Sequence, residues 1–100
     1  MQLDQKEIKL IEDYFSTQPV LRAFVFGSYS RNEANKSSDL DILVDLDYSC
    51  HIGFGFVAIK EGLEKKLHRK VDLVSSKAIS KYILPFIEKE KQLIYERKNG

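Results

Sequence analysis

The sequence predicts a small α/β domain, in which a mixed β-sheet is covered by helices on one face. Residues 40–46 carry an apolar side chain at every even position, with acids at 41 and 45 and a leucine at 43 on the other face, which is the pattern of a strand with one buried face. Residues 21–26 and 70–74 are short, apolar runs that suit two further strands. Residues 8–15 and 56–67 carry apolar side chains at helical spacing, so each predicts a helix that packs on the sheet.

Length and composition limit the chain to one class of protein. One hundred residues make a single domain, 1–100, with one modest core. With 43% hydrophobic and 31% charged residues, the composition is that of a globular protein. No apolar run is long enough to cross a bilayer, and the N-terminus has no signal-peptide pattern, so we expect no membrane association and a cytoplasmic location.

Charge and cysteine content exclude two further kinds of site. The net charge is +1, so the chain lacks the basic surface of a nucleic-acid-binding protein, and a nucleic-acid substrate is not expected. The single cysteine, Cys50, can form neither an internal disulfide nor, without clustered His or Cys partners, a zinc site.

The first helix is predicted from its N-terminal signal. Asp4 occupies the N-cap position and Glu7 follows three residues later, as in a capping box. Leu3 and Ile8 are spaced as a hydrophobic staple. The helix must end before Pro19, because proline cannot continue it.

The first strand, residues 21–26, ends at Gly27 and Ser28. A Gly-Ser turn between a strand and a segment of helix formers can present backbone amides and a hydroxyl to an anion such as phosphate. Alone, this dipeptide would predict only an ordinary turn. The acidic residues that follow change that interpretation.

The second strand, residues 40–46, brings two carboxylates to one face. Asp39 and Asp41 lie about 7 Å apart at a rise of roughly 3.3 Å per residue, on the face opposite the apolar side chains. Two such acids suit Mg²⁺, which also accepts phosphate oxygens. Together with the Gly-Ser turn they indicate a site for a nucleoside triphosphate and its metal, whereas Asp45 and Asp47 are interpreted as solvated.

The loop 48–55 contains His51, which we interpret as a partly solvated side chain rather than a catalytic one. The helix 56–67 follows. The basic residues after it, from Lys65 to Arg69, are interpreted mainly as compensation of the helix dipole.

The third strand, residues 70–74, carries one acid, Asp72, in an apolar setting. A carboxylate there is costly unless it is paired or metal-bound, so Asp72 is predicted to complete the acidic site.

A third helix is predicted to follow Ser75 or Ser76, with a kink at Pro85. Its apolar side would comprise Ile79, Tyr82, Ile83, Phe86 and Ile87. Residues 92–95 predict a last short strand, and residues 96–100 a frayed polar tail.

These features in this order resemble the DNA polymerase β-like nucleotidyltransferases, and the short length resembles their MNT-type minimal branch. The resemblance covers residues 21–74 and rests on the Gly-Ser pair, Arg31, the Ser38–Asp41 segment and the 71–74 segment. It departs at Asn32, where the family often has glycine, although asparagine tolerates the left-handed conformation.

The resemblance implies roles for these residues. Asp39, Asp41 and Asp72 would be catalytic and would bind Mg²⁺, two ions in all, with ATP as the substrate. The nucleotide would be bound by Gly27, Ser28, Arg31 and Ser38. From the sequence, Arg31 could equally touch phosphate or brace the acidic strand.

The resemblance also implies a partner. A member of this branch would transfer AMP to a hydroxyl, in this case of a tyrosine, on a HEPN-domain toxin encoded nearby, and so act as its antitoxin. Two alternatives stay open: a non-catalytic antitoxin that acts by docking, and nucleotidylation of a small molecule such as an aminoglycoside.

Overall fold

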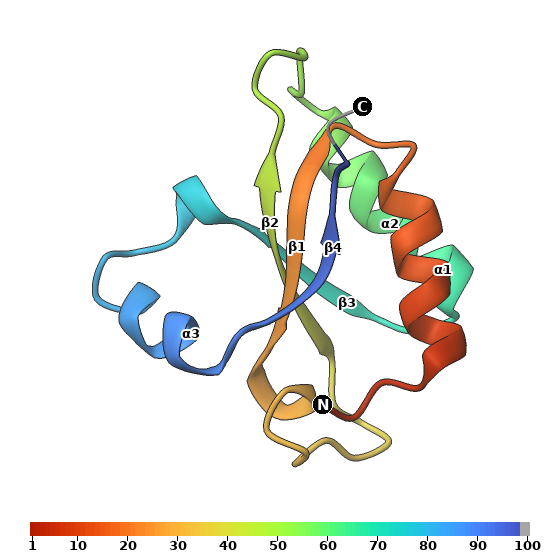
Figure 1. The fold of residues 1–100 in the computed structure, drawn as a ribbon, viewed down its shortest axis with the longest axis vertical. Coiled ribbons are helices and arrows are strands. Elements are labelled where there is room, and N and C mark those ends of the chain that lie inside the picture. Colours follow the sequence, from red (N-terminus) through yellow and green to blue (C-terminus); the bar gives the residue numbers. More distant parts are fainter. Residues whose placement is uncertain (99–100) are drawn as a thin grey trace.

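The computed structural model describes residues 1–98 of the chain, which form a four-stranded sheet with three α-helices (Figure 1). The elements in order are α1 (Gln5–Phe15), β1 (Val20–Phe26), the 3-10 turn η1 (Gly27–Tyr29), β2 (Leu40–Leu46), α2 (Gly55–Leu67), β3 (Val71–Ser75), the 3-10 turn η2 (Ser76–Ala78), α3 (Leu84–Glu90) and β4 (Gln92–Glu96).

The sheet is mixed, as the sequence predicts. Its strand order is β3-β2-β1-β4. β1 is antiparallel to both of its neighbours, β2 and β4, whereas β2 and β3 are parallel. This arrangement places the end of β1 beside the beginnings of the other three strands, at one end of the sheet.

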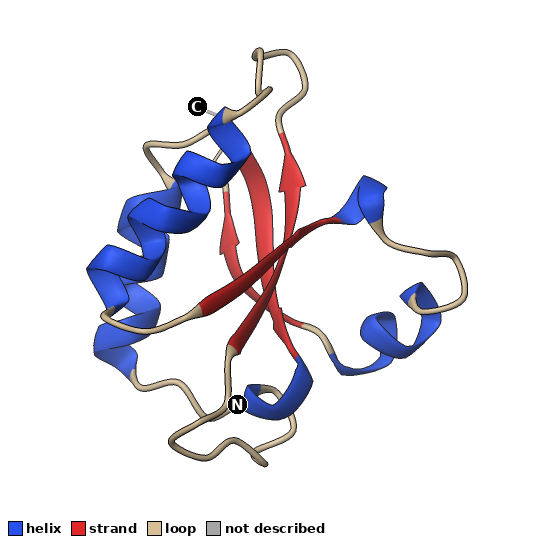
Figure 2. Ribbon diagram, turned by 180° about the vertical axis from the view of Figure 1, so that it is seen from behind, coloured by secondary structure: helices blue, strands red, loops and turns tan. Residues whose placement is uncertain are grey.

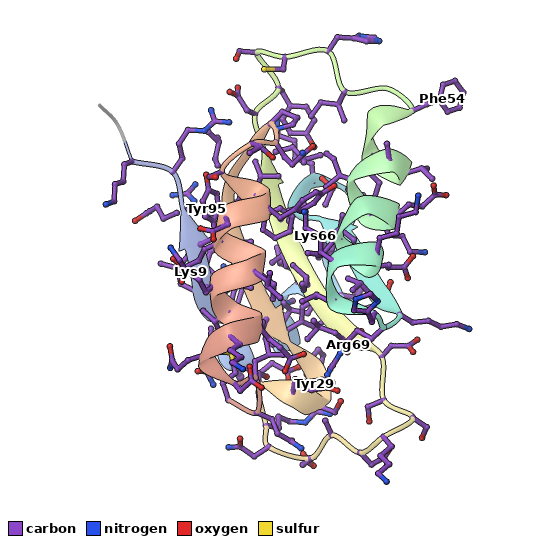
Figure 3. The ribbon with its side chains drawn as sticks, turned by 90° about the vertical axis from the view of Figure 1, so that its right-hand side faces the viewer. Lys9, Tyr29, Phe54, Lys66, Arg69 and Tyr95 are labelled. Carbon is purple, nitrogen blue, oxygen red and sulfur yellow. The ribbon has the colours of Figure 1, made fainter. Side chains whose placement is uncertain are left out.

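The main core lies between the sheet and the helices α1 and α2, which run side by side over one face (Figures 2 and 3). Ile11 and Phe15 from α1 and Leu63 from α2 are fully buried there. Ile42 and Val44 of β2 face this layer and are equally buried, as the alternation of the strand predicts.

The start of α1 follows only half of the predicted capping box. The Oδ1 atom of Asp4 accepts a hydrogen bond of 2.8 Å from the amide of Glu7, and Leu3 is buried against the core with Ile8 beside it. The carboxylate of Glu7, however, lies 2.8 Å from the guanidinium of Arg69. A distant ion pair has therefore replaced the second bond of the box.

The segment after β3 differs from the prediction. Pro85 occupies the first turn of α3, where its missing N–H costs no hydrogen bond, so it begins a short helix instead of kinking a longer one. Of the predicted apolar side, only Ile87 is buried. In Figure 1, α3 lies on the other side of the sheet from α1 and α2.

The predicted frayed tail is also corrected at its start. Glu96 pairs with Arg22 of β1 as the last residue of β4. Arg97 lies 2.6 Å from the Oδ2 atom of Asp47, which fixes the end of the strand. Residues 99 and 100 of that tail lie outside the described residues. No helix within residues 1–98 is long and apolar enough to span a membrane.

Candidate active site

Two of the predicted acids meet across the parallel strands. The register of β2 and β3 places Asp41 directly opposite Asp72. Their neighbours Leu40, Ile42 and Leu73 are buried in the main core. Because successive side chains of a strand point to opposite faces, both acids lie on the face that α1 and α2 leave open.

Asp41 is held in an environment that disfavours its charge. Burial raises the pKa of its carboxyl to about 6, and a hydrogen bond and the charge of Asp72 act in the same direction. The charges of Asp39 and Glu90 raise this pKa further. The carboxyl of Asp41 therefore binds a proton more readily than a solvent-exposed aspartate does when no cation is present.

Gly27 brings the turn against these acids. Its φ of +72° lies in the left-handed region that glycine tolerates, and a Cβ at this position would overlap the Oδ2 atom of Asp41. Only a glycine therefore allows the backbone to approach the carboxylate this closely. Ser28 follows in η1, half-buried, and its hydroxyl makes no hydrogen bond within residues 1–98.

Arg31 does not touch the acidic strand. Its guanidinium lies 2.9 Å from Glu33 and 2.5 Å from Glu90, the last residue of α3. The structure thus brings Arg31 close to the turn but engages it with two other carboxylates. Asn32 has a φ of 60°, which confirms that it adopts the left-handed conformation in place of glycine.

Asp39 and Ser38 lie just before β2. The Ser38 hydroxyl accepts a hydrogen bond of 3.0 Å from the amide of Asn35, so in this structure it closes the turn that leads into the strand. The side chain of Asp39 is exposed. Its charge contributes to the raised pKa of Asp41.

The three acids do not form a complete metal site in this arrangement. Within residues 1–98, no three His, Cys, Asp or Glu side chains are grouped closely enough to hold a metal ion. Asp41 and Asp72 nevertheless lie together, and none of the three acids forms an ion pair with a Lys or Arg of the described chain. Carboxylate oxygens without a counter-charge are the kind of ligand that a hard divalent cation prefers.

A set of contacts among Glu7, Tyr29 and Arg69, which we name the bracket, holds the turn and is not predicted from the sequence. Arg69 donates a hydrogen bond to the hydroxyl of Tyr29, lies 5.0 Å from the centroid of its ring, and pairs with Glu7 (Figure 3). By its sequence, Arg69 belongs to a basic cluster at the helix end. The sequence offers no signal for this contact, because its three residues come from distant parts of the chain.

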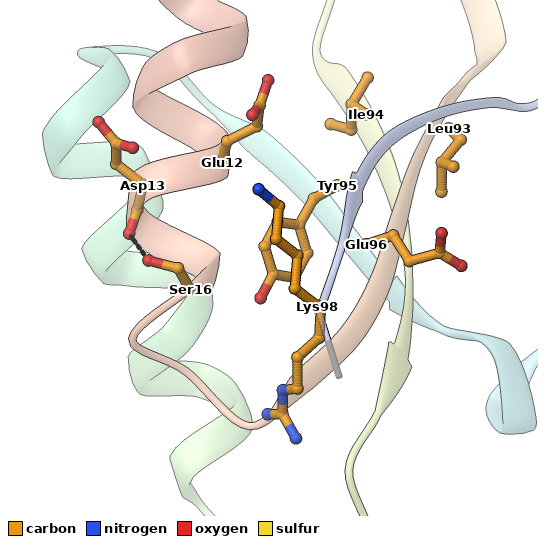
Figure 4. Close-up of a pocket in the computed structure, with 9 residues that line it drawn as sticks. Glu12, Asp13, Ser16, Leu93, Ile94, Tyr95, Glu96 and Lys98 are labelled. Atoms are coloured by element: carbon orange, nitrogen blue, oxygen red, sulfur yellow. Dashed lines mark hydrogen bonds between the residues drawn. The ribbon is translucent and has the colours of Figure 1, made fainter. Parts of the chain in front are cut away.

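Two other features lie away from the acids. His51 is exposed in the loop after β2, whereas Asp41 lies at the start of that strand. A groove of about 630 Å³ runs between α1 and β4, and Figure 4 shows Glu12, Asp13 and Tyr95 among its lining residues. None of the predicted site residues lines this groove.

The chain matches the polymerase beta nucleotidyltransferase family over residues 9–100. A Methanocaldococcus jannaschii relative with a provisional name of protein adenylyltransferase is 35% identical over 94 residues, covering 91% of this chain and 88% of the relative. The protein adenylyltransferase MntA of Thermococcus cleftensis is 39% identical over 66 residues, covering 66% of each chain.

Solved structures agree with the fold. A minimal nucleotidyltransferase structure superposes with a TM-score of 0.73 at 26% identity, covering 87% of each chain. A toxin–antitoxin structure with AMP-PNP has a TM-score of 0.72 at 23% identity, covering 96% of this chain and 76% of the other. A tri-AMPylated Shewanella oneidensis HEPN toxin in complex with its MNT antitoxin matches with a TM-score of 0.69 at 20% identity, covering 96% and 73%.

Proposed function

This chain belongs to the polymerase beta nucleotidyltransferase family, and from that premise we propose that it transfers AMP from ATP to a hydroxyl group of a partner protein. The partner is a HEPN-domain toxin, the acceptor hydroxyl is that of a tyrosine, and the chain acts as the antitoxin. Residues 1–100 act as one domain, in the cytoplasm.

One observation carries this proposal. Asp41 and Asp72 face each other on parallel strands, and the glycine turn at Gly27 lies against Asp41. A triphosphate bound at the turn would have its phosphates next to the two carboxylates. The names of the relatives support the rest, because one is a protein adenylyltransferase and another structure contains an AMPylated HEPN toxin.

Each site residue has a role in the proposed reaction. Gly27 lets the backbone approach the triphosphate, and the Ser28 hydroxyl donates to a phosphate oxygen. Asp39, Asp41 and Asp72 would hold Mg²⁺, two ions as the family resemblance implies. Bound Mg²⁺ would supply positive charge at the triphosphate and lower the pKa of the acceptor hydroxyl. Ser38 shapes the approach to Asp39, and Arg31 would reach phosphate only after leaving Glu90.

The chemical step is an in-line displacement at the α-phosphorus of ATP. The acceptor oxygen forms a bond to this phosphorus while the bond to the leaving pyrophosphate breaks. The hydroxyl proton passes to a carboxylate, and Asp72 is exposed at the position where an acceptor would arrive. The products are the adenylylated acceptor and pyrophosphate.

Labelled ATP with Mg²⁺ and the co-expressed HEPN-domain protein tests the proposal. Wild-type chain should label the HEPN protein, while Asp39→Asn and Asp41→Asn should lower labelling by roughly a hundredfold or more, because each removes a ligand of the metal site. Asp45→Asn is the matched control, since Asp45 lies on the same strand but pairs with Arg22 at 2.9 Å.

Two results would contradict the proposal. If Asp41→Asn protected cells from the toxin as well as wild type does, the chain would act by docking alone. If label appeared on an aminoglycoside but not on the HEPN protein, the acceptor would be a small molecule.

A further inference from the structure

Three large apolar side chains in the α3 segment stand in solvent. Tyr82, Ile83 and Phe86 are 75%, 56% and 69% exposed, and together we name them the α3 patch. Single exposed apolar residues are common on protein surfaces, but three within five residues form a contiguous apolar patch of the kind found at protein interfaces. α3 itself buries only Ile87, so the segment does not need these side chains for its own packing.

A second apolar surface lies elsewhere and serves as a comparison. Phe54 and Val57, at the start of α2, are 95% and 51% exposed. Figure 3 shows Phe54 pointing away from the body of the molecule, at the far end of α2 from Tyr29 and Arg69. This second surface belongs to α2, which packs on the sheet face opposite the acids.

The α3 patch, in contrast, is joined directly to the candidate active site. Glu90 ends α3 and lies 2.5 Å from Arg31, which closely follows the Gly27 turn. Phe86 precedes Glu90 by one helical turn, about 6 Å along the axis. The side-chain amide of Gln92, two residues after Glu90, donates a hydrogen bond of 3.1 Å to the carbonyl of Ser30, close to the same turn. A protein whose hydroxyl reaches Asp72 would therefore extend over α3.

The charged side chains around the α3 patch indicate what kind of partner surface would fit it. Lys81 and Lys89 are exposed, and neither forms an ion pair within residues 1–98; the ammonium of Lys81 lies 5.6 Å from the centroid of the Tyr82 ring. The acids of this segment, in contrast, are engaged: Glu88 with Lys91 and Glu90 with Arg31. The patch thus has an uncompensated positive rim, which favours a partner with carboxylates around its own apolar surface.

We propose that the α3 patch is the docking surface for the protein acceptor, which presents an apolar area edged by acidic side chains. This inference rests on the proposed function and adds to it the surface that selects the acceptor. The ion pair Arg31–Glu90 then connects the docking surface to the turn at which ATP is proposed to bind.

The test compares two double variants of the full chain. Tyr82→Ser with Phe86→Ser removes most of the α3 patch, and Phe54→Ser with Val57→Ser is the matched control at the other apolar surface. Each pair is combined with Asp41→Asn, and the dissociation constant for the HEPN-domain protein is measured by calorimetry. Binding is then read without turnover.

We expect the α3 pair to weaken binding roughly tenfold or more, and the control pair to leave it unchanged. In chains that retain Asp41, the α3 pair should raise KM for the HEPN protein while kcat and the affinity for ATP stay unchanged. An unaltered melting temperature will show that the variants fold.

Three outcomes would overturn the inference: unchanged binding by the α3 pair, an equal loss in the control pair, or a change confined to self-association of the chain as measured by light scattering. Failure of the proposed function would look different. In that case the wild-type chain would transfer no AMP, whatever the two pairs do to binding.

Discussion

Asp41 lies among three other carboxyl groups, those of Asp39, Asp72 and Glu90, and this determines its chemistry. Burial and these neighbours raise its pKa from 3.8 to about 6. A folded state with a raised carboxyl pKa binds the proton more tightly than the unfolded chain does. This group therefore lowers the free energy of unfolding as the pH rises from about 4 to 6, and the cost persists above pH 6 in the absence of a cation.

Asp41→Asn should consequently stabilise the metal-free protein at pH 7.5. We expect about 1 kcal/mol, reduced from the full shift because the group is partly solvated, or a rise in melting temperature of about 4–8 °C. The difference should shrink at pH 4.5, where the wild-type carboxyl is protonated. Calorimetry at both pH values measures it. A lower melting temperature for Asp41→Asn at pH 7.5 would contradict this account, and Asp45→Asn should not raise it.

At the level of elements, the bracket of Glu7, Tyr29 and Arg69 joins α1, η1 and the approach to β3. Arg69 donates to the Tyr29 hydroxyl and pairs with Glu7 at 2.8 Å. Tyr29 directly follows Ser28, and Arg69 lies three residues before Asp72. The bracket therefore holds the proposed triphosphate turn at a fixed place relative to the third acid.

Tyr29→Phe removes the hydroxyl that Arg69 contacts but keeps the buried ring, so the turn should be held less firmly relative to Asp72. Loss of one hydrogen bond should lower the free energy of unfolding by about 1 kcal/mol, because the guanidinium loses a partner. KM for ATP should rise several-fold with a smaller change in kcat, because the turn is displaced more than the acids are. Steady-state kinetics and thermal melting give both values.

Lys66→Gln is the control for this experiment, since Lys66 is an exposed member of the same basic run (Figure 3). An equal effect of Lys66→Gln would mean that net positive charge, and not the bracket, is responsible.

At the scale of the whole molecule, Arg97, the residue after β4, links several elements at the edge of the sheet remote from the acids. Arg97 pairs with Asp47 at 2.6 Å and donates to the carbonyl of Gln18 at 3.2 Å, so residues after β4, β2 and α1 meet there. Hydrogen bonds from Ser49 and from Arg97 lower the pKa of Asp47 to about 2.

A carboxyl whose pKa is lowered by folding stabilises the folded protein at pH values above its pKa in the unfolded chain, about 4. This stabilisation is lost as the pH falls toward 2. Asp47→Asn should thus reduce the melting temperature at pH 7 but have progressively less effect between pH 4 and pH 2. Circular dichroism melts across this range measure the difference. A constant difference at all pH values would show that the ionised form of Asp47 is not what stabilises the fold.

The local patterns of the sequence predicted much of the fold and of the site. The alternation of β2, the turn at Gly27, the cap at Asp4 and the helix α2 each depend on residues a few positions apart, so their spacing is readable before folding. The positions of Asp41 and Asp72 on facing strands also agree with the prediction, because both lie on the polar face of an apolar strand.

Only the tertiary structure decided which distant residues meet. It engaged Arg31 with Glu90, linked Arg69 to Tyr29, and left the apolar side chains of the α3 patch exposed, whereas the sequence predicts a packed apolar face there. An amphipathic pattern states that one face of a segment is apolar, but not whether the sheet has room to cover it. Such contacts depend on where the chain returns after many residues, and no local spacing encodes that return.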